Sequence, residues 1–151
     1  MENQVEVTSR RQRDVGDNTF AQLDWKNLFL LETPGDDEVG GLPRQVPGAC
    51  WSRVHPTSVP NPRLRLWSDE VGELLNLQRG NESILGGNQV VEGMDPYAQR
   101  YGGHQFGNWA NQLGDGRAIT LGEVDTGNEI LELQLKGPGI TPYSRFADGK
   151  A

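Results

Sequence analysis

The sequence predicts an α+β fold built around an antiparallel β-hairpin, with a glycine-rich loop before the hairpin and short helices flanking it. The two hairpin strands are the alternating runs "AITLGEV" (118–124) and "EILELQLKG" (129–137), and "DTGN" between them supplies the tight turn. The loop is "LGDGR" (113–117), directly before the first of these runs. Glycine and proline make up 29 of 151 residues, so regular structure is expected to be sparse.

The N-terminal part is expected to hold a tail and two short helices. Residues 1–18 are polar, charged and without period, which predicts a disordered acidic tail. The segment 20–31 predicts a short helix with an apolar face at Phe20, Leu23 and Leu28. A second helix is expected to begin after Ser68, a good N-cap residue, and to end by Gly80; its expected apolar face is Val71, Leu74, Leu75 and Gln78.

The stretch before the loop is expected to contain one more helix and one strand. In "MDPYAQRYGG", Asp95 resembles an N-cap, Pro96 a first helical residue, and the two glycines a stop. "HQFGNWANQ" (104–112) is expected to be the strand that leads into the loop. The predicted organisation is therefore a tail (1–18), an N-terminal extension (19–103) and the start of a sheet domain (104–151).

Composition and charge exclude several classes of partner. The formal net charge is −7, and residues 1–40 carry −5 of it. A basic stripe that would release counterions from nucleic acid is lacking, so no nucleic-acid partner is expected. No apolar stretch approaches the roughly 18 residues of a membrane span, so no membrane partner is expected. Cys50 is the single cysteine, which excludes an internal disulfide and favours the bacterial cytoplasm.

The glycine-rich loop and the second strand together suggest an anion site. Gly114 and Gly116 lack a Cβ, so the backbone can approach phosphate oxygens, and Arg117 adds a fork of charged donors. Lys136 alternates with the leucines of its strand and should therefore point to the opposite face, below the loop. Gly-Asp-Gly before a strand is more often an ordinary turn than a phosphate site, and spacing alone leaves both interpretations open.

Protein kinases use a comparable layout, with a glycine-rich loop between the first two strands and a phosphate-binding lysine on the third. A Walker P-loop is excluded because GxxxxGK[ST] does not occur in the sequence. A Rossmann site is excluded because a strand rather than a helix follows the glycines.

Longer motifs carry a more specific resemblance. "GHQFG", "QLGDGRA", "LKGPGITPYSR" and "DGKA", together with "PTSVPNPRLRLWSDEVGELLNLQ" upstream, resemble the SelO (YdiU) family over residues 50–151. This resemblance implies a protein-kinase-like fold, of which the chain would be an N-lobe portion. It also implies an enzyme that binds ATP in an inverted orientation with Mg²⁺ or Mn²⁺ and transfers AMP to Ser, Thr or Tyr hydroxyls of proteins, releasing pyrophosphate.

The resemblance also assigns residues by motif position. Gly114, Gly116 and Arg117 match the nucleotide-binding loop of the family, and Lys136 matches its phosphate-binding lysine. Asp148 and Gly149 match a further nucleotide-contacting pair. The catalytic aspartate and the metal ligands of the family are expected beyond Ala151, so none is assigned within the chain, and the chain by itself is expected to be inactive.

Several points stay open at this level. Asn111 replaces the usual proline before Gln112, and Phe146-Ala147 replaces a common glycine pair, which puts the loop shape in doubt. Asp115 is expected to be a turn residue, and Thr141 and Ser144 to brace loops. Arg145 could reach phosphate or form a surface ion pair. A non-catalytic nucleotide-binding pseudokinase module or scaffold, and an ordinary protein kinase, are the alternative functions.

Overall fold

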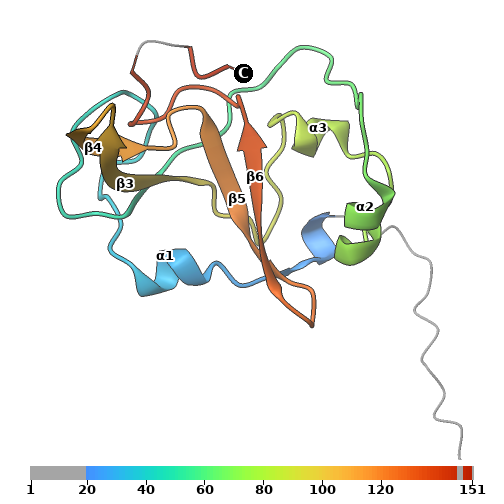
Figure 1. The fold of residues 1–151 in the computed structure, drawn as a ribbon. Coiled ribbons are helices and arrows are strands. Elements are labelled where there is room, and N and C mark those ends of the chain that lie inside the picture. Colours follow the sequence, from blue (N-terminus) through green and yellow to red (C-terminus); the bar gives the residue numbers. More distant parts are fainter. Residues whose placement is uncertain (1–19, 146–147, 151) are drawn as a thin grey trace, which may run out of the picture.

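A computed structural model describes residues 20–145 and 148–150, so the expected tail at 1–18 lies outside the described part of the chain. The fold is a mixed one, with a six-stranded antiparallel sheet and a few short helices (Figure 1). The strands are β1 (Asp24–Trp25), β2 (Trp51–Arg53), β3 (Tyr97–Gln105), β4 (Asn108–Gly114), β5 (Ala118–Asp125) and β6 (Ile130–Lys136). The helices are the 3-10 helix η1 (Phe20–Gln22), α1 (Leu28–Glu32), α2 (Asp69–Leu75) and α3 (Glu82–Leu85).

The predicted hairpin is confirmed as β5 and β6. These strands pair antiparallel from Ala118↔Lys136 to Asp125↔Ile130, with a register shift between Thr120 and Gly122. Gly127 adopts a φ of 86° in the connecting turn, and its N–H donates to Asp125 Oδ1. The turn therefore has the glycine that a positive φ requires.

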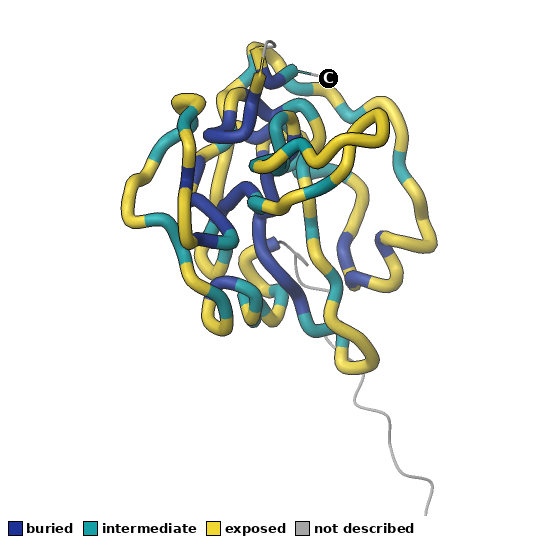
Figure 2. The backbone as a smooth tube through the Cα atoms, turned by 60° about the vertical axis from the view of Figure 1, so that its left-hand side comes forward, coloured by how far each residue is buried: buried dark blue, intermediate teal, exposed yellow. Residues whose placement is uncertain are grey.

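Strand β5 is the centre of the sheet. It pairs with β6 on one side, and with β3 and β1 on the other, while β3 also pairs with β2 and β4. Residues 118–124 of β5 are all buried, which appears in Figure 2 as a dark segment through the middle of the molecule. Elements on both faces cover this strand, so its polar residues Thr120 and Glu123 are buried together with its apolar ones.

The helix expected at residues 95–101 is wrong, because residues 97–101 form the first half of β3. Tyr97 pairs with Arg53 of β2 on one edge and with Thr120 of β5 on the other. Asp95 does not cap a helix; its carboxylate accepts hydrogen bonds from Arg53 Nε and Nη2 at 2.9 and 2.8 Å. Backbone pairing on both edges has overridden a local helix signal.

The helix expected over 20–31 is also wrong as a single element. The segment forms η1, β1 and α1, because Asn27 adopts a left-handed φ of 50° and breaks the helical path. The Asn27 side chain is fixed in that position by two hydrogen bonds, accepting from the Glu123 N–H and donating to the Gly93 carbonyl. Hydrogen bonds to segments distant in the sequence thus stabilise the interruption of the helix at Asn27.

The helix after Ser68 is confirmed as α2, with its N-cap hydrogen bond from the Val71 N–H to Ser68 Oγ at 3.3 Å. It ends at Leu75, before the expected Gly80, because Asn76 takes the left-handed conformation that terminates it. The predicted apolar face is only partly correct, since Leu75 is buried whereas Val71 is 51% exposed. The short α3 was not foreseen.

Three groups of buried side chains hold the described elements together. One joins η1, α2 and α3 to the apolar face of β5 and β6, where Leu131, Leu133 and Leu135 lie. The second packs Ile119 of β5 and Ala98 of β3 against Tyr143 and against apolar residues on either side of β2. The third joins α1, β2 and β3 through Leu30, Trp51 and Tyr97. The boundary expected between residues 103 and 104 lies inside β3.

Candidate functional site: a basic cavity beside the glycine-rich loop

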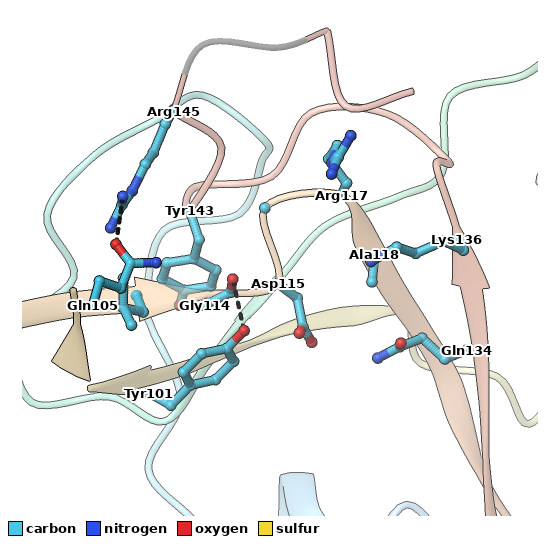
Figure 3. A pocket seen from close by; sticks show the side chains of 12 residues that line it. Tyr101, Gln105, Gly114, Asp115, Arg117, Ala118, Gln134, Lys136, Tyr143 and Arg145 are labelled. Atoms are coloured by element: carbon cyan, nitrogen blue, oxygen red, sulfur yellow. Dashed lines mark hydrogen bonds between the residues drawn. The ribbon is translucent and has the colours of Figure 1, made fainter. Parts of the chain in front are cut away.

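A cavity of about 500 Å³ opens where the chain passes from β4 into β5. Figure 3 shows the side chains around it, with the loop at the centre, β6 on one side and the end of the β3–β4 hairpin on the other. The residues that line it are Tyr101, Gln105, Leu113, Gly114, Asp115, Gly116, Arg117, Ala118, Gln134, Lys136, Tyr143 and Arg145. Four of the six residues proposed for nucleotide binding therefore share one cavity.

Asp148 and Gly149 are not among the residues that line this cavity. Gly149 packs against the segment after β6, where its carbonyl accepts from the Gly139 N–H at 3.0 Å. The Asp148 carboxylate accepts from the N–H of Lys150. In the described chain these two residues support the turn after β6, and their nucleotide contact remains a prediction.

The glycine-rich loop does not reverse the chain. Both β4 and β5 run antiparallel to β3, with Arg100↔Gly114 on one side of the loop and Tyr97↔Thr120 on the other. Residues 115–117 therefore bulge out of one continuous path along β3. The chain reverses earlier, at Phe106-Gly107, so the loop is not a hairpin turn of the kind expected from kinases.

The two loop glycines are required by internal packing. A Cβ on Gly114 would lie 2.4 Å from Tyr143 Cγ and 2.6 Å from the Gln99 carbonyl oxygen. A Cβ on Gly116 would lie 2.9 Å from the Tyr143 carbonyl oxygen. Internal packing therefore requires both glycines, whether or not a ligand approaches the loop. The N–H groups of Asp115 and Gly116 donate to the carbonyls of Gln99 and Gly114, so they too are used inside the protein.

A turn at residues 141–144 holds the loop from behind, as expected of Thr141 and Ser144. Thr141 Oγ1 donates to the Asp115 carbonyl at 2.6 Å, and Ser144 Oγ donates to the Gly116 carbonyl at 2.5 Å. Ser144 Oγ also accepts from the Thr141 N–H. Two successive carbonyls of the loop are therefore fixed by hydroxyl groups, and both hydroxyl residues are buried.

Tyr143 connects this turn to the N-terminal part of the chain. Its hydroxyl lies 2.8 Å from Ser52 Oγ, which donates to Asp36 Oδ2. The same carboxylate oxygen forms an ion pair with Arg44 at 2.6 Å. Burial opposes the charge of Asp36, but the hydrogen bonds from Ser52 and Arg44 outweigh it, and its pKa is lowered. This network supports the ring that packs under Gly114.

Lys136 lies on the face of β6 opposite the leucines, as the alternation predicted, and Gln134 lies beside it on the same face. Gln134 was not predicted as a site residue, although the alternation of β6 places it on the same face as Lys136. Tyr101, Gln105 and Tyr143 were also missed. Their positions depend on the course of β3 and of the 141–144 turn, which local patterns did not indicate.

Asp115 is the carboxylate within the glycine-rich loop, and it is held by a backbone hydrogen bond from β3. Its Oδ2 accepts from the Gln99 N–H at 3.1 Å, so the side chain continues the hydrogen bonding to β3 where the backbone bulges away. Burial raises the pKa of Asp115, while the Gln99 N–H and the charge of Lys136 act in the opposite direction. The expectation of a turn residue agrees with this geometry.

Positive charge dominates the cavity. Arg117, Lys136 and Arg145 line it, and none of them forms an ion pair with a carboxylate of the described residues; the ion pairs found there involve Lys26, Arg44 and Arg53. Three such cations around one opening favour a ligand with several negative charges. Within residues 20–145 and 148–150 no group of three or more His, Cys, Asp or Glu side chains could hold a metal ion. The residues present therefore do not fit a complete Mg²⁺ or Mn²⁺ site.

The fold and site define a small antiparallel sheet with a basic, glycine-bordered cavity, and sequence comparison places this arrangement in a family. Residues 44–151 match the family described as protein adenylyltransferase SelO, and the chain belongs to that family. It is 54% identical over 132 residues to the protein nucleotidyltransferase YdiU of Nitrosospira multiformis, covering 83% of the chain and 23% of that protein. It is 55% identical over 136 residues to the YdiU protein of Methylobacillus flagellatus, covering 85% and 26%.

The chain thus spans about a quarter of the length of these curated relatives. Among the helices of the described residues, none has the length and apolar character needed to cross a membrane.

Proposed function

We propose that this chain forms the nucleotide-binding part of an enzyme that transfers AMP from ATP to Ser, Thr or Tyr hydroxyls of proteins. The observation that carries the proposal is the grouping of Arg117 and Lys136 around the cavity beside the glycine-rich loop, where neither forms an ion pair with a carboxylate of the described residues. Membership of the adenylyltransferase family, and relatives named as protein nucleotidyltransferases, support the reaction class.

In this proposal the cavity binds the triphosphate. Arg117 offers a planar fork of donors and Lys136 a compact ammonium, so together they can neutralise charge on adjacent phosphates. The buried turn at Thr141 and Ser144 keeps the loop rigid, which limits the entropy lost when the ligand binds. The nucleotide-contacting roles of Gly114, Gly116, Asp148 and Gly149 belong to the same proposal, as does a kinase-like N-lobe.

The reaction would proceed at the α-phosphorus. The oxygen of a protein hydroxyl forms a bond to Pα, the bond between Pα and the bridging oxygen breaks, and pyrophosphate leaves with that oxygen. The hydroxyl proton passes to a base, and the described residues supply no base that the geometry assigns to this step. The ligands for Mg²⁺ or Mn²⁺ are proposed to lie in regions that the relatives carry beyond the matched part.

Labelled ATP tests the proposal in a full-length family member that carries these 151 residues. Label from the α-phosphate should appear on a protein substrate, and Lys136→Ala should lower its transfer at least a hundredfold, since it removes a charge that opposes the triphosphate. Transfer of γ-label instead would indicate a protein kinase, and ATP binding without transfer would indicate a non-catalytic module. An unchanged rate in Lys136→Ala would remove the assigned role of that lysine.

A further inference from the structure

Arg145 is a third cation of the cavity, and it comes from a different segment than the other two. It follows the 141–144 turn, and its guanidinium lines the same opening as Arg117 and Lys136. In the view of Figure 3, Arg145 and Lys136 lie on opposite sides of the loop, with Arg117 between them. A ligand that filled the cavity would therefore meet positive charge from two sides.

The partner of Arg145 is a neutral amide. Arg145 Nη1 donates to Gln105 Oε1 at 2.9 Å, and Gln105 lies at the end of β3, forty residues earlier in the chain. A surface ion pair, the alternative use of this arginine, is not found with any carboxylate of the described residues. The amide orients the guanidinium without neutralising it, which leaves the charge and its remaining donors for a ligand.

Other arginines of the chain show what a structural role looks like here. Arg44 pairs with Asp36 at 2.6 Å, and Arg53 pairs with both carboxylate oxygens of Asp95. Each of these arginines ties two segments together through opposite charge. Arg145 also joins two segments, but through an uncharged group beside a cavity that already holds two cations.

We propose that Arg145 binds the polyphosphate chain of the nucleotide as a third cation and that Gln105 is its positioning residue. The inference rests on the proposed function, because it assigns a further contact to the same ligand. The proposal predicts that the contribution of Arg145 to the binding affinity grows with the number of phosphates in the ligand. A residue that merely braced the hairpin would affect ATP and AMP alike.

Calorimetric titrations of ATP and AMP into a full-length family member carrying these 151 residues test this prediction. Arg145→Ala should weaken ATP binding about tenfold to a hundredfold, as expected for loss of charge-assisted hydrogen bonds, and change AMP binding by less than about threefold. Arg145→Lys should recover part of the loss, since it keeps the charge but not the fork. The exposed Arg79 supplies the control, and Arg79→Ala should leave both affinities unchanged.

Gln105→Ala tests the positioning role. It should weaken ATP binding about two- to fivefold in the native background and have no further effect once Arg145 is alanine, because the amide acts only through the guanidinium. Circular dichroism and the melting temperature of each variant separate a binding defect from unfolding.

The outcomes separate this inference from the proposed function. If Arg145→Ala binds ATP as the native protein does while Lys136→Ala loses binding, only the role of Arg145 is wrong. An equal loss for ATP and AMP in Arg145→Ala would also overturn it. If the native protein binds no ATP, both the inference and the proposed function are overturned.

Discussion

Replacing Gly116 by alanine probes the packing of the glycine-rich loop most directly. The new Cβ would lie 2.9 Å from the Tyr143 carbonyl oxygen and 3.4 Å from Ser144 Cα. Both are backbone atoms of a buried turn, so they cannot move aside as the end of a side chain can. The loop must therefore shift away from residues 141–144.

The magnitude follows from the two hydrogen bonds that this shift would break. Thr141 Oγ1 to the Asp115 carbonyl and Ser144 Oγ to the Gly116 carbonyl contribute about 1 kcal/mol each. Alanine returns roughly 0.5–1 kcal/mol by restricting the unfolded chain. We expect Gly116→Ala to lower the free energy of unfolding by about 1 to 1.5 kcal/mol, which is close to a tenfold change in the folding equilibrium.

Urea unfolding of the 151-residue chain, followed by tryptophan fluorescence, measures this change. Gly103→Ala is the matched control, since its Cβ would meet only the Leu113 Cδ1 methyl at 3.0 Å, the mobile end of a side chain. Equal stability of the two variants would refute the reasoning. ATP binding should also weaken in Gly116→Ala, because Arg117 moves with the loop.

Two further predictions concern the glycine-rich loop and the turn between β3 and β4. Burial raises the pKa of Asp115 in the folded protein above its ordinary value of 3.8. Ionisation of Asp115 therefore lowers the free energy of unfolding, fully so above the folded-state pKa. Below pH 3.8 the side chain is protonated in both states, and this effect is absent. Asp115→Asn keeps an acceptor for the Gln99 N–H and should be more stable than the native chain at pH 7, with the difference vanishing near pH 3.8. Urea unfolding across this pH range measures the difference. A difference in stability that grows toward acid pH would contradict this prediction. Phe106 is fully exposed at a left-handed φ of 51°, a conformation that costs a bulky residue about 1–2 kcal/mol. Phe106→Asn should therefore raise the free energy of unfolding by about 1 kcal/mol, and an unchanged value would show that the turn relaxes.

Sequence patterns predicted those elements whose signals are local. The β5–β6 hairpin has alternation and a turn glycine, and α2 has Ser68 at its start, so both were found. Helix α2 was given a wrong end, because Asn76 in the left-handed conformation was not recognised as a stop. The helix expected around Pro96 was wrong because the pairing of Tyr97 with β2 and β5 depends on segments more than 20 residues away in the chain.

The candidate site was predictable to a similar degree. The alternation of β6 placed Lys136 on the face opposite the leucines, and the proximity of Arg117 to the loop needed no further assumption. The hydrogen bond between Arg145 and Gln105 could not be predicted, because it joins the segment after β6 to the end of β3. The same holds for Tyr143 under Gly114, which requires the complete course of both segments.

The structure changes which features of the loop point to a ligand. Gly114 and Gly116 are explained by the turn at 141–144, whose atoms leave no room for a Cβ, and the Asp115 and Gly116 amides donate to carbonyls of the protein. Glycines in this motif would thus be needed even in a chain that bound nothing. The cations have less internal explanation: none of Arg117, Lys136 and Arg145 forms an ion pair with a carboxylate of the described residues, although the charge of Lys136 acts on Asp115. The case for a polyanion therefore depends on these three side chains, and a variant that removes one of them should lose affinity for ATP in calorimetric titrations.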